Sequence, residues 1–396
     1  MHSLNISSMA KKIYFIMLKN IYRIFVNIPK NSKLIVFESF LGKQYSDSPR
    51  AIYEYIKENH PALKTYWVVD PRYKNNFADC NLRTVYKFSP KWLLIMLRSK
   101  YWVFNTRIPL WVKRGKGTVY LQTWHGTPLK KLGLDIKEVH MPGTTTESYH
   151  KNFSLASKKW TYLISANKFS SEIFKRAFDF DGEMIEVGYP RNDKLIKDNT
   201  LEKINSIKNS LSIDRSKKVI LYAPTWRDNA FHKKGSYKFQ LELDLKHLEK
   251  EFGEDYIIIM RLHYLISDST DFSQYSYIRD CSHYDDISDL YLISDVLITD
   301  YSSVFFDYAL LKRPILFFAY DLEEYRDKLR GFYLDFPEKA PGSVVKSTEQ
   351  LVVELRKLEK MNFQVSHKHL NFLEEIGTFD DGASTMNVVN IMLDTN

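Results

Sequence analysis

The chain has 396 residues, of which 44% are hydrophobic and 27% charged, and its formal net charge is +9. This length predicts two domains, and the absence of low-complexity tracts excludes a disordered tail or linker. Two distant cysteines exclude a disulfide framework, and dispersed basic residues without RNP-type or zinc-finger spacing lead us to expect no sequence-specific nucleic-acid binding.

The N-terminal stretch 9–33 mixes apolar and basic residues and contains no acidic residue. The pattern predicts a basic amphipathic helix that ends at Pro29. Such a helix could lie on an anionic membrane surface, but a helix packed on the domain with its lysines in water explains the pattern equally well. No apolar run is long enough to cross a bilayer, and no signal-peptide cleavage pattern occurs.

Short apolar strands then alternate with helical segments, and a polar segment at 194–218 predicts a connection between two domains. Ser89 and Pro90 predict a helix start. Near-continuous apolar strands separated by helices predict an α/β fold with parallel sheets, arranged as two Rossmann-like domains facing a cleft. The predicted strands are 33–39, 64–70, 101–106, 117–122, 162–166, 219–224, 256–261, 296–299 and 314–318.

In open α/β sheets, ligands bind beyond the carboxyl ends of the strands, so the loops that follow the strands are the candidate site. Five such loops carry hydroxyl, guanidinium, imidazole or carboxylate groups. Their residues are Trp124, His125, Gly126, Thr127 and Pro128; Pro190, Arg191, Asn192 and Asp193; Thr225, Trp226, Arg227 and Asp228; Arg261, Leu262 and His263; and Asp300, Tyr301, Ser302, Ser303 and Asp307.

The last of these loops predicts a phosphate site. Ser302 and Ser303 stand at a predicted helix start, where backbone N–H groups and hydroxyls donate to phosphate, and Asp307 one turn later suits ribose hydroxyls. Simple capping by Asp300 or Ser302 is the alternative. Arginines after other strands also suit phosphate, although each could instead form a surface salt bridge. They are Arg191, Arg227 and Arg261.

His125 is a candidate general base, and His263 a candidate donor to a leaving phosphate. His367 and His369 stand in a polar helical context and are predicted to be solvated. No zinc-ligand spacing, P-loop or G-x-G-x-x-G motif occurs. An acidic cluster is interpreted as the charged start of a helix and comprises Asp285, Asp286 and Asp289.

Six ordered motifs resemble the CDP-glycerol glycerophosphotransferase family: LQTWHGTPLKKLGLD, GYPRND, YAPTWRD, RLH, ITDYSSVFFDYALLKRP and LRGFYLDF, with DDGAS near the C-terminus. The length is most similar to the short wall teichoic acid primases. The resemblance implies a GT-B-like fold: a membrane-associating segment (1–30), an acceptor-side Rossmann-like domain (31–200) and a CDP-glycerol-binding Rossmann-like domain (201–396).

The resemblance also implies the reaction, which is transfer of glycerol phosphate from CDP-glycerol to the glycerol-phosphate end of an undecaprenyl-linked teichoic acid primer. CMP is released, no metal or other cofactor is needed, and the enzyme lies peripherally on the cytoplasmic face of the membrane. A poly(glycerol phosphate) polymerase, a CDP-ribitol-using transferase and a non-catalytic nucleotide-binding scaffold are the alternatives. The sequence leaves open whether the chain forms a homo-oligomer.

Carried onto this sequence, the resemblance makes His125 the base that deprotonates the acceptor hydroxyl, and places His263 and Arg261 at the pyrophosphate. Thr225 and Trp226 would line the CDP pocket. The other residues expected to bind CDP-glycerol are Trp124, Gly126, Thr127, Pro128, Arg191, Ser302, Ser303 and Asp307.

Overall fold

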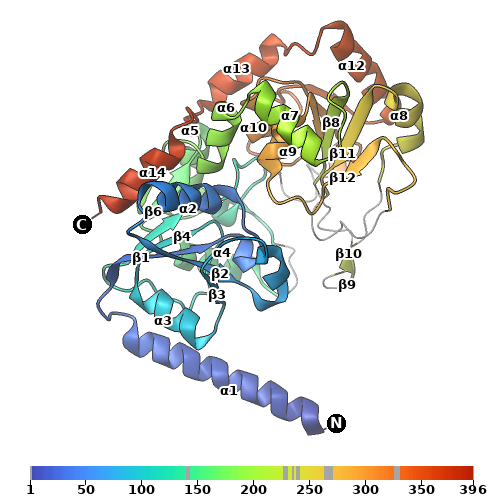
Figure 1. The fold of residues 1–396 in the computed structure, drawn as a ribbon. Coiled ribbons are helices and arrows are strands. Elements are labelled where there is room, and N and C mark those ends of the chain that lie inside the picture. Colours follow the sequence, from blue (N-terminus) through green and yellow to red (C-terminus); the bar gives the residue numbers. More distant parts are fainter. Residues whose placement is uncertain are drawn as a thin grey trace.

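The computed structural model contains two α/β domains, drawn at the lower left and upper right of Figure 1. Each domain is built on one parallel sheet, which confirms the predicted fold class. The structure describes residues 2–139, 143–225, 231–233, 236–237, 241–262, 271–324 and 331–395.

The sheet of the N-terminal domain has seven parallel strands in the order β3-β2-β1-β4-β5-β6-β7. Their apolar runs are buried because α2, α3, α4 and α5 cover the sheet. The strands are β1 (Asn31–Glu38), β2 (Lys64–Val69), β3 (Thr84–Tyr86), β4 (Ser99–Phe104), β5 (Val119–Gln122), β6 (Tyr162–Ser165) and β7 (Glu183–Glu186). The helices are α2 (Asp47–Asn59), α3 (Pro90–Arg98), α4 (Thr146–Ser157) and α5 (Lys168–Ala177). Ser89 caps α3 as predicted, because its hydroxyl accepts from the Trp92 N–H at 3.1 Å.

The sheet of the C-terminal domain has six parallel strands in the order β12-β11-β8-β13-β14-β15. They are β8 (Lys218–Ala223), β11 (Tyr256–Met260), β12 (Ile278–Asp280), β13 (Val296–Thr299), β14 (Ile315–Phe318) and β15 (Ser343–Val345). The helices of this domain are α8 (Leu245–Phe252), α9 (Ile287–Ile293), α10 (Val304–Ala309), α11 (Leu322–Glu324) and α12 (Thr348–Lys360). A separate two-stranded ribbon pairs β9 (Phe231–Lys233) with β10 (Ser236–Tyr237).

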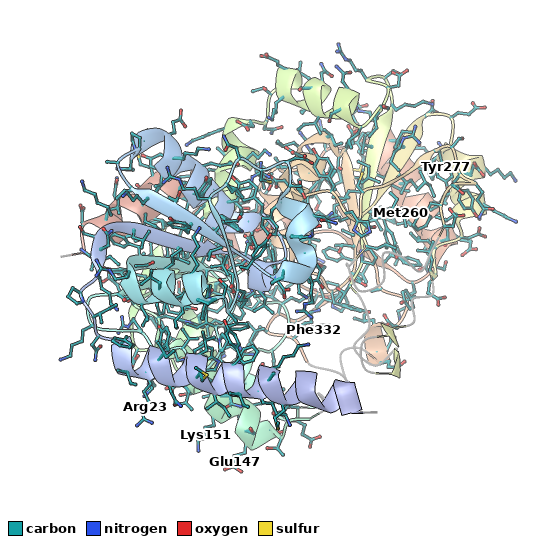
Figure 2. All side chains as sticks on the ribbon, turned by 60° about the horizontal axis from the view of Figure 1, so that its bottom comes forward. Arg23, Glu147, Lys151, Met260, Tyr277 and Phe332 are labelled. Atoms are coloured by element: carbon teal, nitrogen blue, oxygen red, sulfur yellow. The ribbon has the colours of Figure 1, made fainter. Side chains whose placement is uncertain are left out.

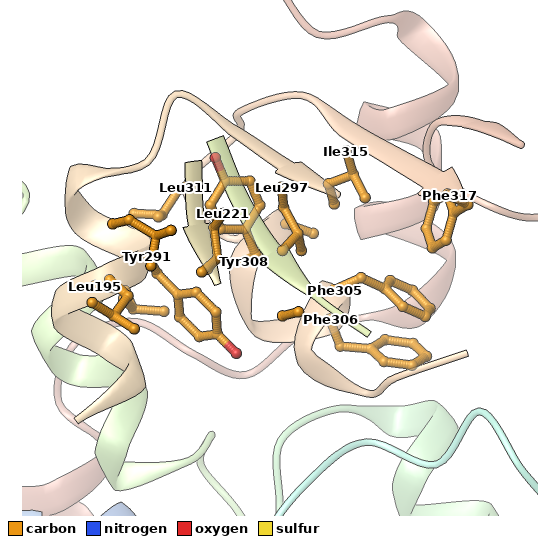
Figure 3. Close-up of a cluster of buried hydrophobic side chains, with 14 of the residues drawn as sticks. Leu195, Leu221, Tyr291, Leu297, Phe305, Phe306, Tyr308, Leu311, Ile315 and Phe317 are labelled. Carbon is orange, nitrogen blue, oxygen red and sulfur yellow. The ribbon is translucent and has the colours of Figure 1, made fainter. Parts of the chain in front are cut away.

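One face of the second sheet packs against α9 and α10 (Figure 3). Leu221 and Leu297 of neighbouring strands share a buried cluster with Phe305 of α10 and Tyr291 of α9. Leu195 of α6 (Asp193–Lys197) enters the same cluster. The polar segment between the domains is therefore anchored to the C-terminal core, and α7 (Leu201–Ser210) continues from it.

The C-terminal end of the chain returns to the N-terminal domain. After α13 (His367–Ile376), α14 (Ser384–Leu393) lies beside α2 (Figure 1). Val388 and Met392 of α14 are fully buried in the cluster that contains Ile35 of β1. The predicted boundaries assigned 201–396 to the C-terminal domain, whereas the apolar face of α14 completes the cover of the first sheet.

The prediction of a solvated His369 is wrong. The residue is 1% exposed, and its Nε2 lies 3.1 Å from the carbonyl oxygen of Ala309. The helical context of His369 is polar, but one face of α13 packs on the C-terminal core and carries this imidazole inward with Phe372.

The first helix, α1 (His2–Phe25), lies along the outer side of the N-terminal domain next to α3 (Figure 1). Leu18 and Tyr22 bury one face of α1, and the hydroxyl of Tyr22 donates to the Lys113 carbonyl at 2.7 Å. Arg23 projects from the outer side of the helix (Figure 2). Within the described residues, no helix is long and apolar enough to cross a membrane.

Candidate active site

The two domains meet at the carboxyl ends of their strands. A methyl group placed on Gly126, after β5, would lie 2.8 Å from the hydroxyl oxygen of Ser303, which precedes α10. A larger residue at this position would require the side chain of Ser303 to move. The structure therefore brings the Trp-His-Gly loop of one domain against the Ser-Ser loop of the other, as the strand-end argument predicts.

His125 lies at this junction with its imidazole held from both sides. Its ring stacks on Trp124 with centroids 4.4 Å apart, and contacts the ring of Phe40 at 5.9 Å. Its Nδ1 lies 2.8 Å from the backbone oxygen of Asn105. A carbonyl oxygen can only accept, so Nδ1 carries the proton and Nε2 keeps its lone pair. This tautomer can accept a proton from a substrate hydroxyl.

The surroundings of His125 keep the imidazole neutral. Although solvent reaches the residue, the surrounding protein desolvates the ring, and this burial lowers its pKa below the ordinary value of 6.5. The hydrogen bond to Asn105 and the charge of Asp47 oppose the shift, whereas the charges of Arg191 and Arg107 add to it. At neutral pH the imidazole is therefore deprotonated and available as a base.

Asn105, at the end of β4, fixes the loops around His125. The residue is fully buried, and its Oδ1 accepts from the Phe40 N–H at 2.8 Å. Its Nδ2 donates to the Ser39 hydroxyl at 3.1 Å and to the Asp47 carboxylate at 2.7 Å. One side chain thus connects the base to the loop after β1 and to the start of α2.

Backbone strain gathers around the same point. Trp124, Phe40, Leu41 and Asp47 have φ values of 54°, 44°, 65° and 64°, in the left-handed region that non-glycine residues rarely adopt. Each such residue costs about 1–3 kcal/mol and persists only where the surroundings enforce it. Here the contacts of Asn105 hold the strained loops, which indicates a preorganised site.

A buried ion network crosses the domain boundary. Arg191, after β7, donates to Asp47 of α2 at 2.8 Å and to Asp307 of α10 at 2.9 Å. These three side chains are at most 10% exposed. Burial alone would lower the pKa of Arg191, but Asp307 and Asp47 raise it well above its ordinary value, so the guanidinium stays charged. In this structure Arg191 and Asp307 bind each other, so their predicted contacts with CDP-glycerol stay predictions.

Asp380 extends this network beside Asn192. The Asn192 amide donates to Asp307 at 3.1 Å and to Asp380 at 3.2 Å. Asp380 also accepts from the Tyr189 N–H at 2.9 Å and from the Thr378 hydroxyl at 2.9 Å. Burial, helped by the charge of Asp307, raises the pKa of Asp380 to about 7. This carboxyl therefore titrates near neutral pH.

Three loops of the C-terminal domain lie next to one another at the site, because β11, β8 and β13 are neighbours. Arg261 donates to the carbonyls of Cys281 and Ser282 at 2.7 and 2.8 Å, and burial lowers its pKa. Asp300 accepts from the Thr225 N–H at 2.8 Å, which joins the loops after β8 and β13. The guanidinium of Arg261 is thus oriented by neutral carbonyls.

Ser302 and Ser303 make no side-chain hydrogen bond within the ranges that the structure describes. Ser303 occupies the N-cap position of α10 without capping it through its side chain. Since α10 has only six residues, a phosphate here would depend on the hydroxyls and local N–H groups more than on a helix dipole. The predicted phosphate contact stays a prediction.

Other members of the predicted site have structural contacts. Thr127 is buried and accepts from the Asn167 amide at 2.9 Å, and Pro128 is buried beside it. The predicted residues Trp226, Arg227, Asp228 and His263 lie outside the described residues.

The acidic cluster marks a helix start, as predicted. Asp286 caps α9 by accepting from the Ser288 N–H, and Asp286 and Asp289 both bind Lys194 of α6. Over the described part of the chain, no three His, Cys, Asp or Glu side chains gather in a way that could hold a metal ion.

Sequence reasoning did not identify three residues of the site, namely Asn105, Asp47 and Asp380. Asn105 directly follows a strand, so the strand-end rule could have identified it. Asp380 opens the DDGAS motif, which the resemblance includes without a role for this residue. No local signal marks Asp47, because its role depends on α2 converging on Arg191.

Comparison with known proteins identifies the family. Residues 20–394 match the family described as CDP-Glycerol:Poly(glycerophosphate) glycerophosphotransferase. The chain belongs to this family of glycerophosphotransferases. It is 50% identical over 386 residues to a teichoic acid poly(glycerol phosphate) polymerase of Bacillus subtilis, covering 97% of this chain and 52% of that relative. The chain thus spans about half the length of that relative. A teichoic acid poly(glycerol phosphate) polymerase of Bacillus spizizenii is 49% identical and matches over 97% of its own length.

Solved structures of a wall teichoic acid polymerase support the same family assignment. The wall teichoic acid polymerase TagF superposes with a TM-score of 0.86 at 44% identity, over 92% of this chain and 89% of that one. A histidine-to-asparagine variant of that polymerase was solved after a soak with CDPG. A teichoic acid glycerol-phosphate primase of Bacillus subtilis is less similar, with 31% identity over 75% of this chain. The two-domain GT-B-like architecture of the glycerophosphotransferase is therefore established.

The raised pKa of Asp380 predicts a specific pH dependence of stability. An aspartate in the unfolded chain has a pKa near 4, so the folded protein keeps a proton between about pH 4 and 7 that the unfolded chain releases. Stability therefore falls as the pH rises through this window. We expect the free energy of unfolding of Asp380→Asn, relative to that of the wild type, to rise by about 2–3 kcal/mol between pH 5 and pH 8.

Urea unfolding at the two pH values measures this difference. The control is Asp381→Asn, which changes the adjacent, exposed carboxylate and should give no gain at pH 8. Equal destabilisation by Asp380→Asn at both pH values would contradict the assignment.

Proposed function

We propose that this enzyme transfers glycerol phosphate from CDP-glycerol to the glycerol-phosphate end of a lipid-linked teichoic acid acceptor and releases CMP. The observation that carries the proposal is the approach of Gly126 to Ser303, which supports a site where the loop that carries the neutral His125 meets a hydroxyl-rich loop of the other domain. A base in one domain and phosphate donors in the other suit a reaction between two substrates. The CDPG-soaked structure of a related polymerase supports the nucleotide donor.

The proposed reaction follows from the positions of these groups. Nε2 of His125 removes the proton of the acceptor hydroxyl, whose oxygen forms a bond to the phosphorus that carries the glycerol. The bond from this phosphorus to the bridging oxygen breaks, and the electron pair leaves with CMP. Arg261, His263 and the hydroxyl of Ser303 would stabilise the charge on the leaving phosphate. The proton on His125 then passes to solvent.

Sequence identity favours repeated addition of glycerol phosphate. The chain is 50% and 49% identical to two poly(glycerol phosphate) polymerases, compared with 31% for a primase of the same pathway. A poly(ribitol-phosphate) polymerase is 29% identical, which favours glycerol over ribitol as the transferred unit. The short-primase resemblance inferred from chain length is thus replaced by a proposal of polymer formation.

The outer face of α1 supports binding to a membrane surface. Its apolar side chains recur at helical spacing, opposite the buried Leu18 and Tyr22. Lys12, Lys19 and Arg23 are exposed on the flank of this stripe. The stripe consists of Met9, Ile13, Ile16, Met17 and Ile24, which are 50–73% exposed. We propose that α1 lies in the interface of the anionic cytoplasmic leaflet, where the acceptor is anchored.

His125→Ala should abolish turnover while CDP-glycerol still binds. Loss of a general base lowers kcat by about 10²–10⁴-fold, whereas the nucleotide is held mainly by the other domain. Steady-state kinetics measures kcat, and calorimetry measures the affinity for CDP-glycerol.

In the wild type, kcat should be constant above about pH 6.5 and fall below it, because burial lowers the pKa of His125 and only protonation disables the base.

The control for this variant is His60→Ala. His60 follows the end of α2 that is opposite Asp47, about 20 Å along the helix, and should be dispensable. Retained turnover in His125→Ala would contradict the assignment of His125 as the general base.

Replacing Ile13 and Ile24 together by Asp should weaken binding to vesicles of phosphatidylglycerol and phosphatidylcholine at least about tenfold, because two charges would enter the apolar stripe. Cosedimentation measures the bound fraction. Leu201→Asp is the matched control, since Leu201 is 78% exposed on α7 of the other domain. Equal binding of both variants would show that α1 does not contact the membrane.

A further inference from the structure

A half-buried arginine near the base has no counter-charge. Arg107 follows Asn105 by two residues, and its guanidinium lies over the rings of Phe153 and Tyr149, at 4.2 and 5.7 Å from their centroids. Burial lowers its pKa, and no carboxylate acts in the opposite direction. In the described part of the chain, its guanidinium has neither a hydrogen bond nor a salt bridge.

Other enclosed arginines of this protein are satisfied internally. Arg191 binds two carboxylates, and Arg261 binds two backbone carbonyls. Desolvating a cation without a partner is costly, and a protein normally avoids this cost unless an anion completes the site. The environment of Arg107 therefore points to an anionic ligand.

Arg107 is next to the base but not on the nucleotide side. β4 and β5 are adjacent strands, so Arg107 and His125 follow neighbouring strand ends. Phe153, which lies beneath Arg107, contacts Trp124 at 6.3 Å, and Trp124 stacks on His125. The groups proposed to hold the leaving phosphate of CDP-glycerol, Arg261 and Ser303, follow strands of the other domain. An anion on Arg107 would therefore belong to the second substrate.

A second candidate donor, Thr106, directly precedes Arg107 in the chain. The hydroxyl oxygen of Thr106 is buried and has no hydrogen-bond partner among the described residues. Buried hydroxyls are normally paired, so the unpaired hydroxyl of the residue before Arg107 is a second group that an anion would satisfy. The planar guanidinium can bind two phosphate oxygens at once, and the ring of Phe153 fixes its plane.

We infer that Arg107 and Thr106 bind the phosphodiester anion of the last glycerol phosphate unit of the acceptor, so that its terminal hydroxyl reaches Nε2 of His125. The inference rests on the proposed function, and assigns Arg107 the choice of an anionic over a neutral acceptor. An anion bound at Arg107 would also change the pKa of His125. The charge of Arg107 lowers the pKa of His125, so an anion on Arg107 would strengthen the base when the acceptor is bound.

The test uses the full chain and bis(glyceryl) phosphate, a soluble phosphodiester, titrated in the absence of CDP-glycerol and followed by phosphorus NMR. Arg107→Ala should weaken binding about 10- to 100-fold, as expected for the loss of a charge-assisted pair. Arg114→Ala should bind like the wild type, because Arg114 lies at the opposite, amino-terminal edge of the sheet, beside Thr161. Arg107→Gln, which keeps a polar planar end, should also lose the binding.

Unchanged binding in both Arg107 variants, or no binding by the wild type, would overturn the inference. Each variant should keep the wild-type affinity for CDP-glycerol and the wild-type urea midpoint, which separates loss of the site from loss of the fold. A wild type that binds the phosphodiester but never consumes CDP-glycerol would contradict the proposed function alone, so the two failures are distinguishable.

Discussion

The charged contact of Arg191 with Asp47 and Asp307 is the constraint on which the arrangement of the site depends. Removing one partner of such a buried group costs about 3–5 kcal/mol, because it leaves an uncompensated charge. From Asp47 the contacts continue through Asn105 to His125, and from Asp307 through α10 back to Ser303. The orientation of the base in one domain is thereby linked to the phosphate-side loop of the other. Asn192 and Asp380 add a further connection to the segment that leads into α14.

This connection explains how strained loops are kept in place. The left-handed conformations at Trp124 and Phe40 would relax in an isolated loop, but the buried Asn105 holds Phe40 and Asp47 together, and the ring of His125 is stacked on Trp124. The protein thus places its least favourable backbone where the proposed chemistry needs a fixed imidazole. Preorganisation of this kind removes reorganisation from the reaction step.

Much of the fold could be predicted from the sequence. Alternating apolar strands and helices predicted both parallel sheets, and the strand-end rule selected Gly126 and Ser303, which the structure brings into contact. Local sequence patterns did not predict features that depend on packing between distant segments. His369 is buried because α13 turns that face inward, and α14 completes the first domain although it follows the second in sequence. Arg191 has partners that are 144 and 116 residues away, which no local pattern indicates.

The most direct test of the account is the mass of the products that the purified enzyme forms from a lipid-linked primer analogue and either CDP-glycerol or CDP-ribitol. We predict a ladder of products spaced by one glycerol phosphate unit with CDP-glycerol, and no extension with CDP-ribitol. Absence of any product with CDP-glycerol, or extension by ribitol phosphate, would contradict the account that this two-domain site transfers glycerol phosphate.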